Sequence, residues 1–302
     1  MSDDVFCSQL SQQEGEQLFG TAVSNIKVWF ALEYNRPWRA KATVDNDLPT
    51  AVQGWLNDQL EKVGNGRLQF IRQQKDNTPL SFFVGLPENG RLYRFELNNY
   101  EELFQLDIAA VVAGAAQYEA FLWTEPLYLV CTNGKRDRCC ALWGMAFYRA
   151  LQPLAGTAVW QTTHTGGHRF APTLLTLPDG ILHGRLALEN VADFLTAHQQ
   201  GKLLLDNYRG HSHYEPVVQV ADYFLRQTTG ETSLSAYRYH QHQNGNGSQW
   251  RVQFAQDDGT VHEVVVAVET AVPDNLLASC DKLQVKPISQ YTYLAHSVNG
   301  KR

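Results

Sequence analysis

The chain of 302 residues lacks several features that mark particular classes of protein. It has no run approaching the roughly eighteen apolar residues of a membrane-spanning helix. Its first residues, MSDDVFCSQLSQQ, lack the basic start and apolar stretch of a secretory signal. It also lacks excess positive charge, since 25 lysines and arginines face 31 aspartates and glutamates. These absences argue against export, a membrane partner and general nucleic-acid binding, so we expect a cytoplasmic protein.

Cysteine is scarce as well, with five residues in the whole chain. They are Cys7, Cys131, the adjacent pair Cys139 and Cys140, and Cys280. An odd number at irregular spacing is unlike the framework of a disulfide-stabilised domain. The pattern therefore predicts reduced thiols, some of them bound to metal. Because Cys7 and Cys280 are far from the others in sequence, we expect these two to be isolated structural residues.

What is present is an ordinary globular composition, 44% hydrophobic and 19% charged. A chain of this length is expected to form two or three domains with hydrophobic cores. Its apolar patterns predict the same order of elements twice: strand, helix, strand, two further strands and helix. The first series is expected at 27–33, 48–63, 67–73, 79–86, 91–97 and from residue 100, and the second at 126–132, from residue 139, at 158–163, 173–180, 181–186 and 189–203.

The repeated order predicts an α/β fold of two tandem thioredoxin-like modules, in residues 1–124 and 125–205. The alternative is one larger α/β sheet in which the similar order arises by chance. Residues 206–302 are expected to form a small α+β appendage. There we predict a short loop from residue 209, a helix, and a β-hairpin built on Asn-Gly and Asp-Gly turns.

The most informative segment follows the strand predicted at 126–132 and runs from Cys131 to Cys140. In open α/β sheets ligands collect beyond the carboxyl ends of strands. A helix that begins near Cys139 would direct unpaired N–H groups toward sulfur, which favours the thiolate form. The glycine and polar residues between the two cysteines would let the loop wrap around an object larger than a single ion.

A pair of histidines follows the next predicted strand, in the sequence His164-Thr165-Gly166-Gly167-His168. If both lie on one turn, their rings can meet one metal ion, and the glycines allow the backbone unusual dihedral angles close to a cofactor. Imidazole and thiolate both bind iron and zinc, so the residue types alone do not choose the metal.

The stretches VCTNGKRDRCCALWG and WQTTHTGGHRFAPTLLTLPDGILHGRL closely resemble the sucrase/ferredoxin-like family, and further similarity extends over most of the chain. The resemblance implies that residues 125–205 form a thioredoxin-like ferredoxin. The first module has no cysteine after its first strand, at residues 33–38, so we expect it to carry no cluster. It also implies a [2Fe–2S] cluster with Cys131 and Cys140 on one iron and His164 and His168 on the other. The "sucrase" part of the family name has no support, because no carboxylate pair suggests glycoside hydrolysis.

The resemblance favours a one-electron carrier over an enzyme with its own substrate, working with an unidentified reductase or acceptor protein. Histidine ligands would also allow proton transfer to accompany the electron. Three alternatives stay open: Cys139 as the ligand in place of Cys140, a zinc site built from the same four ligands, and a thiol–disulfide redox protein. The last lacks the Cys-x-x-Cys spacing of thioredoxins.

Basic residues surround these ligands in an otherwise acidic chain. Lys135, Arg136 and Arg138, partly offset by Asp137, would either form a solvated loop that neutralises the cluster or dock an acidic redox partner. Gly166, Gly167 and Arg169 border the histidines and are expected to support them. Two further pairs, His211 with His213 and His240 with His242, have no Cys, Asp or Glu companion at fixed spacing and are expected on the surface.

Overall fold

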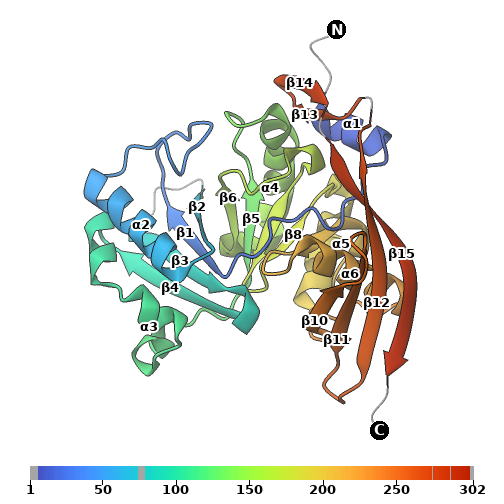
Figure 1. Cartoon of the computed structure of the whole chain (residues 1–302). Helices are drawn as coiled ribbons and strands as arrows, with labels where there is room; N and C mark the ends of the chain where they lie inside the picture. The colour runs from blue at the N-terminus through green and yellow to red at the C-terminus, as the bar shows by residue number, and fades with distance from the viewer. Residues whose placement is uncertain (1–5, 74–78, 274, 286, 300–302) are drawn as a thin grey trace.

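Two sets of four strands with the same internal order form most of the fold, as the computed structural model shows for residues 6–73, 79–273, 275–285 and 287–299 (Figure 1). The first set has the order β4-β3-β1-β2. Read from the opposite edge of the sheet, the second set has the corresponding order β8-β7-β5-β6. Their bounds are β1 Val28–Glu33, β2 Gly66–Arg72, β3 Leu80–Leu86 and β4 Arg91–Leu97, then β5 Leu127–Cys131, β6 Val159–Thr162, β7 Leu174–Leu177 and β8 Ile181–His183.

Corresponding strands in the two sets also run in corresponding directions. β1 is parallel to β2 and antiparallel to β3, just as β5 is parallel to β6 and antiparallel to β7. A helix makes each parallel crossover, α2 (Thr50–Val63) in the first set and α4 (Met145–Ala155) in the second. The repeated element order predicted from the sequence is thus confirmed.

The two sets belong to one mixed sheet of nine strands, because β2 pairs antiparallel with β6. β9 (Tyr208–His211) completes this sheet beside β8. The repeat and the single large sheet, which the sequence offered as alternatives, therefore occur together. The segment from residue 209 was predicted as a loop, and this was wrong for its first residues, which pair with β8.

Alternation along the strands explains how both faces of the sheet are covered. On β1, Phe30 and Leu32 face the core beneath α2 and α3, while Trp29 and Ala31 face a second core. That second core also contains Leu129 and other residues from the second set of strands. The remaining face of the second set packs against α4 and α5 (Val191–Gln199).

Two predicted helices depart from regular α geometry. The helix predicted from residue 100 is interrupted, because Asp107 accepts a hydrogen bond from the Ala110 N–H (3.1 Å) and so caps a new helix, α3 (Ile108–Val112). The helix predicted from Cys139 begins with a π-helical turn at Cys140–Gly144 before α4. Short 3₁₀ turns occur at Pro87–Asn89, Tyr100–Gln105, Ala116–Phe121, Gly156–Ala158, His168–Phe170, Leu188–Asn190 and Leu205–Asn207.

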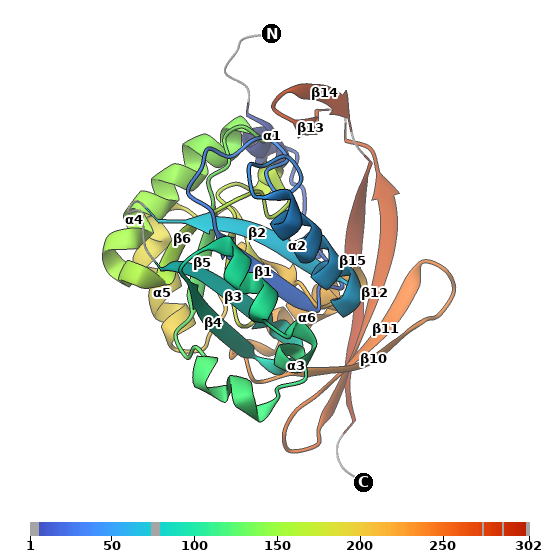
Figure 2. The same cartoon turned by 90° about the vertical axis from the view of Figure 1, so that its left-hand side faces the viewer.

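The C-terminal part of the chain is a separate antiparallel sheet against which α6 (Pro216–Thr229) packs. Its strands, in spatial order, are β10 (Arg238–Asn244), β11 (Gln249–Ala255), β12 (Val261–Ala271) and β15 (Ile288–Asn299). A small ribbon of β13 (Leu277–Ser279) and β14 (Lys282–Val285) projects from it beside the N-terminal helix α1 (Cys7–Gln13) (Figures 1 and 2). None of the described helices is long and apolar enough to cross a membrane.

Candidate metal centre

The end of β5 and the start of the following helix hold Cys131 and Cys140 close together. Both side chains are buried, with exposed fractions of 0% and 1%. The close approach depends on Gly144, because a Cβ at that position would lie 2.0 Å from the carbonyl oxygen of Cys131. The sequence therefore brings the two cysteines together through a glycine whose lack of a side chain lets the helical turn pack on the strand.

A glycine-containing turn presents the two histidines beyond the end of β6. Gly166 and Gly167 adopt φ angles of 101° and 73°, which side chains disfavour. The buried Arg209 fixes this turn, since its Nη1 donates to the carbonyl oxygen of Gly166 at 3.0 Å. His164 is consequently placed beside the two cysteines.

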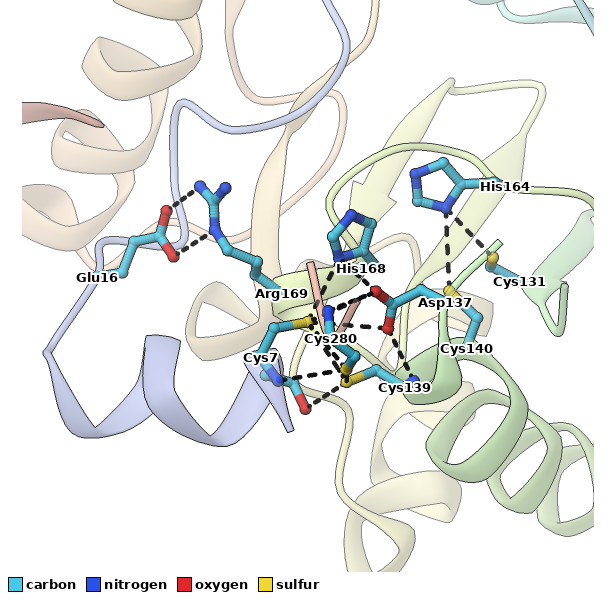
Figure 3. Close-up of polar contacts among 11 residues, drawn as sticks. Cys7, Glu16, Cys131, Asp137, Cys139, Cys140, His164, His168, Arg169 and Cys280 are labelled. Atoms are coloured by element: carbon cyan, nitrogen blue, oxygen red, sulfur yellow. Dashed lines mark hydrogen bonds and ion pairs between the residues drawn. The ribbon is translucent and has the colours of Figure 1, made fainter. Parts of the chain in front are cut away.

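Three of the four predicted ligands form one group (Figure 3). The Nδ1 atom of His164 lies 3.9 Å from the sulfur of Cys131 and 3.9 Å from the sulfur of Cys140. One ligand atom from each of these three residues lies within 4.8 Å of the others. Buried cysteines and a histidine at this spacing could bind a metal.

Hydrogen bonding favours the thiolate form of one sulfur of this pair, that of Cys131. The hydrogen bond from Cys140 outweighs burial and, together with His164, lowers the pKa of Cys131 well below its usual value. The same hydrogen bond and burial raise the pKa of Cys140. The backbone N–H of Asn133 also stabilises the Cys131 sulfur as an anion.

His168, the fourth predicted ligand, is adjacent to this group. Its ring centroid lies 5.3 Å from that of His164, and its Nδ1 lies 3.3 Å from Oδ2 of Asp137 and 3.4 Å from the sulfur of Cys7. Burial is the main cause that lowers the pKa of His168 to about 3, so the ring is neutral near pH 7. Neutral imidazole is the form that binds metal.

Cys139, the predicted alternative to Cys140, belongs to a second buried group. Its sulfur lies 3.5 Å from that of Cys7 and 3.3 Å from that of Cys280, and a carboxylate oxygen of Asp137 completes the group. The expectation that Cys7 and Cys280 are isolated was wrong, because the fold brings α1 and the ribbon of β13 and β14 to Cys139. The spacing of the cysteines in the sequence did not indicate that Cys7 and Cys280 meet. The one hint was Cys139, which is not needed in the group of Cys131, Cys140 and His164.

The basic residues near the ligands are on the surface. Lys135, Arg136 and Arg138 are exposed, whereas Asp137 is 1% exposed and points inward. A cavity of about 600 Å³ next to the histidines is lined in part by Lys135, Arg136 and Lys282. The loop consequently presents positive charge to solvent at the mouth of this cavity.

Arg169, expected to support the histidines, instead anchors the segment after α1. Its Nε donates to Oε2 of Glu16 at 3.0 Å, and its Nη2 donates to the other carboxylate oxygen. The guanidinium of Arg138 lies over the ring of Phe6, 5.5 Å from the centroid. Both contacts hold the N-terminal segment against the loops that carry the candidate metal ligands.

The two other histidine pairs differ in exposure. His240 is exposed as expected, and His242 is partly buried, 3.5 Å from a carboxylate oxygen of Glu215. His211 was expected on the surface, but this was wrong, because it lies on β9 with an exposed fraction of 8%. His213 is partly buried. None of these four residues belongs to the metal-binding groups found among the described residues.

Comparison with known proteins gives a family and one partial relative. A sequence model described as sucrase/ferredoxin-like matches residues 18–210. The chain is also similar to "Altered inheritance of mitochondria protein 32" of Meyerozyma guilliermondii, with 29% identity over 99 residues. That match covers 29% of this chain and 35% of that protein, so it spans little more than a third of the relative. No solved structure matches the chain.

Proposed function

The chain belongs to the sucrase/ferredoxin-like family, and from this premise we propose that it holds a [2Fe–2S] cluster and passes single electrons to or from another protein. The ligands would be Cys131 and Cys140 on one iron and His164 and His168 on the other. The observation that carries the proposal is the buried group in which one histidine nitrogen lies 3.9 Å from both cysteine sulfurs.

The charges of these four residues fit the cofactor. Two thiolates and two neutral imidazoles carry a total charge of −2, which matches the +2 charge of an oxidised Fe₂S₂ unit. A neutral assembly suits a site where Cys131 and Cys140 are almost fully buried, because burying net charge is costly. A bound cluster would accept and release one electron at a time.

Asp137 would orient His168 for this role. A metal-bound histidine commonly donates its other ring N–H to a carboxylate, which fixes the ring orientation and strengthens the ligand. His168 Nδ1 lies 3.3 Å from Asp137 Oδ2, so Nε2 is the atom that would bind iron. Asp137 is itself fixed by the N–H of Cys139, which donates to Oδ1 at 2.9 Å.

The repeated strand order supports two tandem thioredoxin-like modules, the first of them without a cluster. β1 and β5 hold the same place in their sets, and each is followed by a crossover helix. β5 ends at Cys131, whereas β1 ends at Glu33, whose carboxylate accepts the N–H of Ser81 at 2.9 Å. The first module would therefore serve packing and partner contact.

The partner we propose is an acidic redox protein that docks over the histidine side of the site. His164 is partly exposed and, with His168, lines the cavity that also contains Lys135, Arg136 and Lys282. Opposite charge on a partner would speed encounter and orient it with the histidines facing the contact. Reduced thiols in all five cysteines suit the reducing cytoplasm, where we place the protein.

The test is to purify the full chain and measure iron, acid-labile sulfide, zinc and the visible spectrum. We expect a red-brown protein with about two irons and two sulfides per chain. Cys140→Ala and His164→Ala should lose most of both, while Cys139→Ala and the exposed His240→Ala serve as matched controls that retain them.

One result would count against this function, and another would count against one of its ligands. A colourless protein whose Cys131, Cys140 and His164 hold zinc without sulfide would establish a zinc protein instead. If Cys140→Ala keeps the full cluster and Cys139→Ala loses it, the ligand is Cys139 and not Cys140.

A further inference from the structure

A second group of metal-binding side chains gathers where three distant segments meet. Cys7 begins α1, Cys139 precedes the π-helical turn, and Cys280 lies in the turn of the ribbon formed by β13 and β14 (Figure 3). Their exposed fractions are 0%, 0% and 8%. The three cysteines are free and are separate from the group of Cys131, Cys140 and His164.

The sulfur positions have the dimensions of a tetrahedral metal site. The distances are 3.5 Å from Cys7 to Cys139, 3.3 Å from Cys139 to Cys280 and 3.6 Å from Cys280 to Cys7. Zinc–sulfur bonds of about 2.3 Å in a tetrahedron place the sulfurs about 3.8 Å apart. A disulfide requires about 2.05 Å, so the triangle suits one ion held by three sulfurs better than a covalent bond.

A carboxylate oxygen of Asp137 lies beside the three sulfurs. Its two carboxylate oxygens lie 3.8 Å and 3.9 Å from the sulfur of Cys7, and one of them lies within 4.8 Å of all three sulfurs. The N–H groups of Cys139 and Cys280 donate to this carboxylate at 2.9 Å and 3.1 Å. These bonds tie two of the ligand-bearing segments to the same side chain.

Donors directed at the sulfurs indicate that they are built to carry negative charge. Ser8 Oγ donates to the sulfur of Cys139 at 3.2 Å, and the N–H of Cys7 faces the sulfur of Cys280 at 3.4 Å. Several acidic groups buried together need a cation before all of them can ionise.

We propose that Cys7, Cys139, Cys280 and Asp137 bind one Zn²⁺ ion, which fastens the N-terminal helix and the C-terminal ribbon to the cysteine loop. Three thiolates and one carboxylate at tetrahedral spacing match the preferences of zinc. Binding releases the protons of the three thiols to solvent and changes no oxidation state. This site does not depend on the [2Fe–2S] cluster proposed for the other group.

The experiment measures zinc, iron and sulfide in the full chain after loosely held metal has been removed with a chelator. We expect about one zinc per chain in addition to the iron. Cys280→Ser should lower zinc roughly tenfold or more while iron and sulfide remain. Cys131→Ser should lower iron and sulfide while zinc remains. Ser279→Ala, which changes a neighbour in the same ribbon, should leave both zinc and iron unchanged.

Additional variants keep the test decisive if Cys280→Ser fails to fold. Cys280→His retains a zinc ligand and should keep the metal. Cobalt added to zinc-free chain should give the sulfur-to-cobalt charge-transfer band of a tetrahedral thiolate site in the wild type but not in Cys7→Ser. Thermal unfolding of the wild type should shift to lower temperature when zinc is withdrawn, because the ion binds only the folded chain.

The proposal is overturned if the wild-type chain, given excess zinc, retains none after chelation. A disulfide between Cys7 and Cys280 in freshly isolated protein would overturn it too. A colourless chain that loses zinc in Cys280→Ser would support this site while contradicting the [2Fe–2S] cluster, so the two proposals fail separately.

Discussion

At the scale of single residues, adjacent cysteines serve different groups. Cys140 lies 3.9 Å from the imidazole nitrogen of His164, whereas Cys139 lies 3.3 Å from the sulfur of Cys280. Successive residues in a helical turn point about 100° apart, so neighbours in sequence face different surroundings. Asp137 lies between the groups, because it contacts His168 on one side and the Cys280 N–H on the other.

Gly144 is a single position on which the cysteine pair depends. In Gly144→Ala the new Cβ would overlap the carbonyl oxygen of Cys131, which cannot move without shifting β5. We expect a loss of about 1–3 kcal/mol in the free energy of unfolding, together with lower cluster content. Urea unfolding and iron analysis measure both effects.

Gly54 in α2 provides the matched control for this prediction. A Cβ there meets nothing within 4 Å, and the residue is exposed in the helix interior. Gly54→Ala should stabilise the chain by about 0.5–1 kcal/mol and leave the iron content unchanged. Equal stability of the two variants would contradict the importance of the close contact at Gly144.

At the scale of elements, β8, β9 and α5 enclose three histidines, His183, His211 and His198. His183 is 1% exposed, and neither of its ring nitrogens has a hydrogen-bond partner among the residues that the structure describes. Burial, reinforced by His198, His211 and Arg209, lowers the pKa of His183 well below its usual value. The ring is therefore neutral in the folded chain, and this part of the sheet resists protonation.

This burial predicts a loss of stability in acid. Below the usual imidazole pKa of about 6.5, the unfolded chain takes up a proton that folded His183 does not, so stability falls with falling pH. The contribution is complete above about pH 7.5, and His183 alone should remove about 1.4 kcal/mol between pH 7.5 and 5.5. Urea unfolding of wild type and His183→Leu at both pH values measures it.

In His183→Leu the loss of unfolding free energy between pH 7.5 and 5.5 should be smaller than in wild type by the contribution of His183. The exposed His240→Leu should keep the full wild-type loss, which makes it the control for removing a histidine. Equal losses in wild type and His183→Leu would show that His183 is protonated in the folded chain.

At the scale of the whole molecule, the two sets of strands share a core that neither can complete alone. Trp29 and Phe83 of the first set lie in one cluster with Leu129, Trp160 and Leu177 of the second. Each such side chain contributes about 1.5–3 kcal/mol when fully buried. Separating the two sets of strands would expose these side chains to water. The burial free energy lost would then offset the 5–15 kcal/mol by which a typical domain is stable.

We therefore expect the isolated segment 125–205 to aggregate or to lack fixed tertiary structure, although it contains all four proposed cluster ligands. The full chain should keep both sets of strands folded together. Limited proteolysis and the dispersion of amide signals in NMR spectra distinguish the outcomes. A soluble fragment that unfolds cooperatively would establish the module as independent of the rest.

The sequence by itself determined much of the local structure and pointed to the two strand ends where Cys131 and His164 meet. Alternating apolar residues are sufficient to predict strands such as β1 and β5, because side chains on a strand point to opposite faces. The placement of Cys131 and of the histidines at strand ends followed from the same reasoning. Its errors occurred where a local side chain interrupts a pattern, as Asp107 does, or where a short polar stretch pairs with a distant strand, as β9 does.

Only the tertiary structure decided which distant residues meet. The antiparallel pairing of β2 with β6 joins the two repeats, and the ribbon around Cys280 reaches Cys7 across almost the whole chain. Such contacts depend on packing over the entire fold and leave no periodic pattern in the sequence around each residue. The second group of cysteines was therefore invisible in the sequence, although every one of its members could be read there.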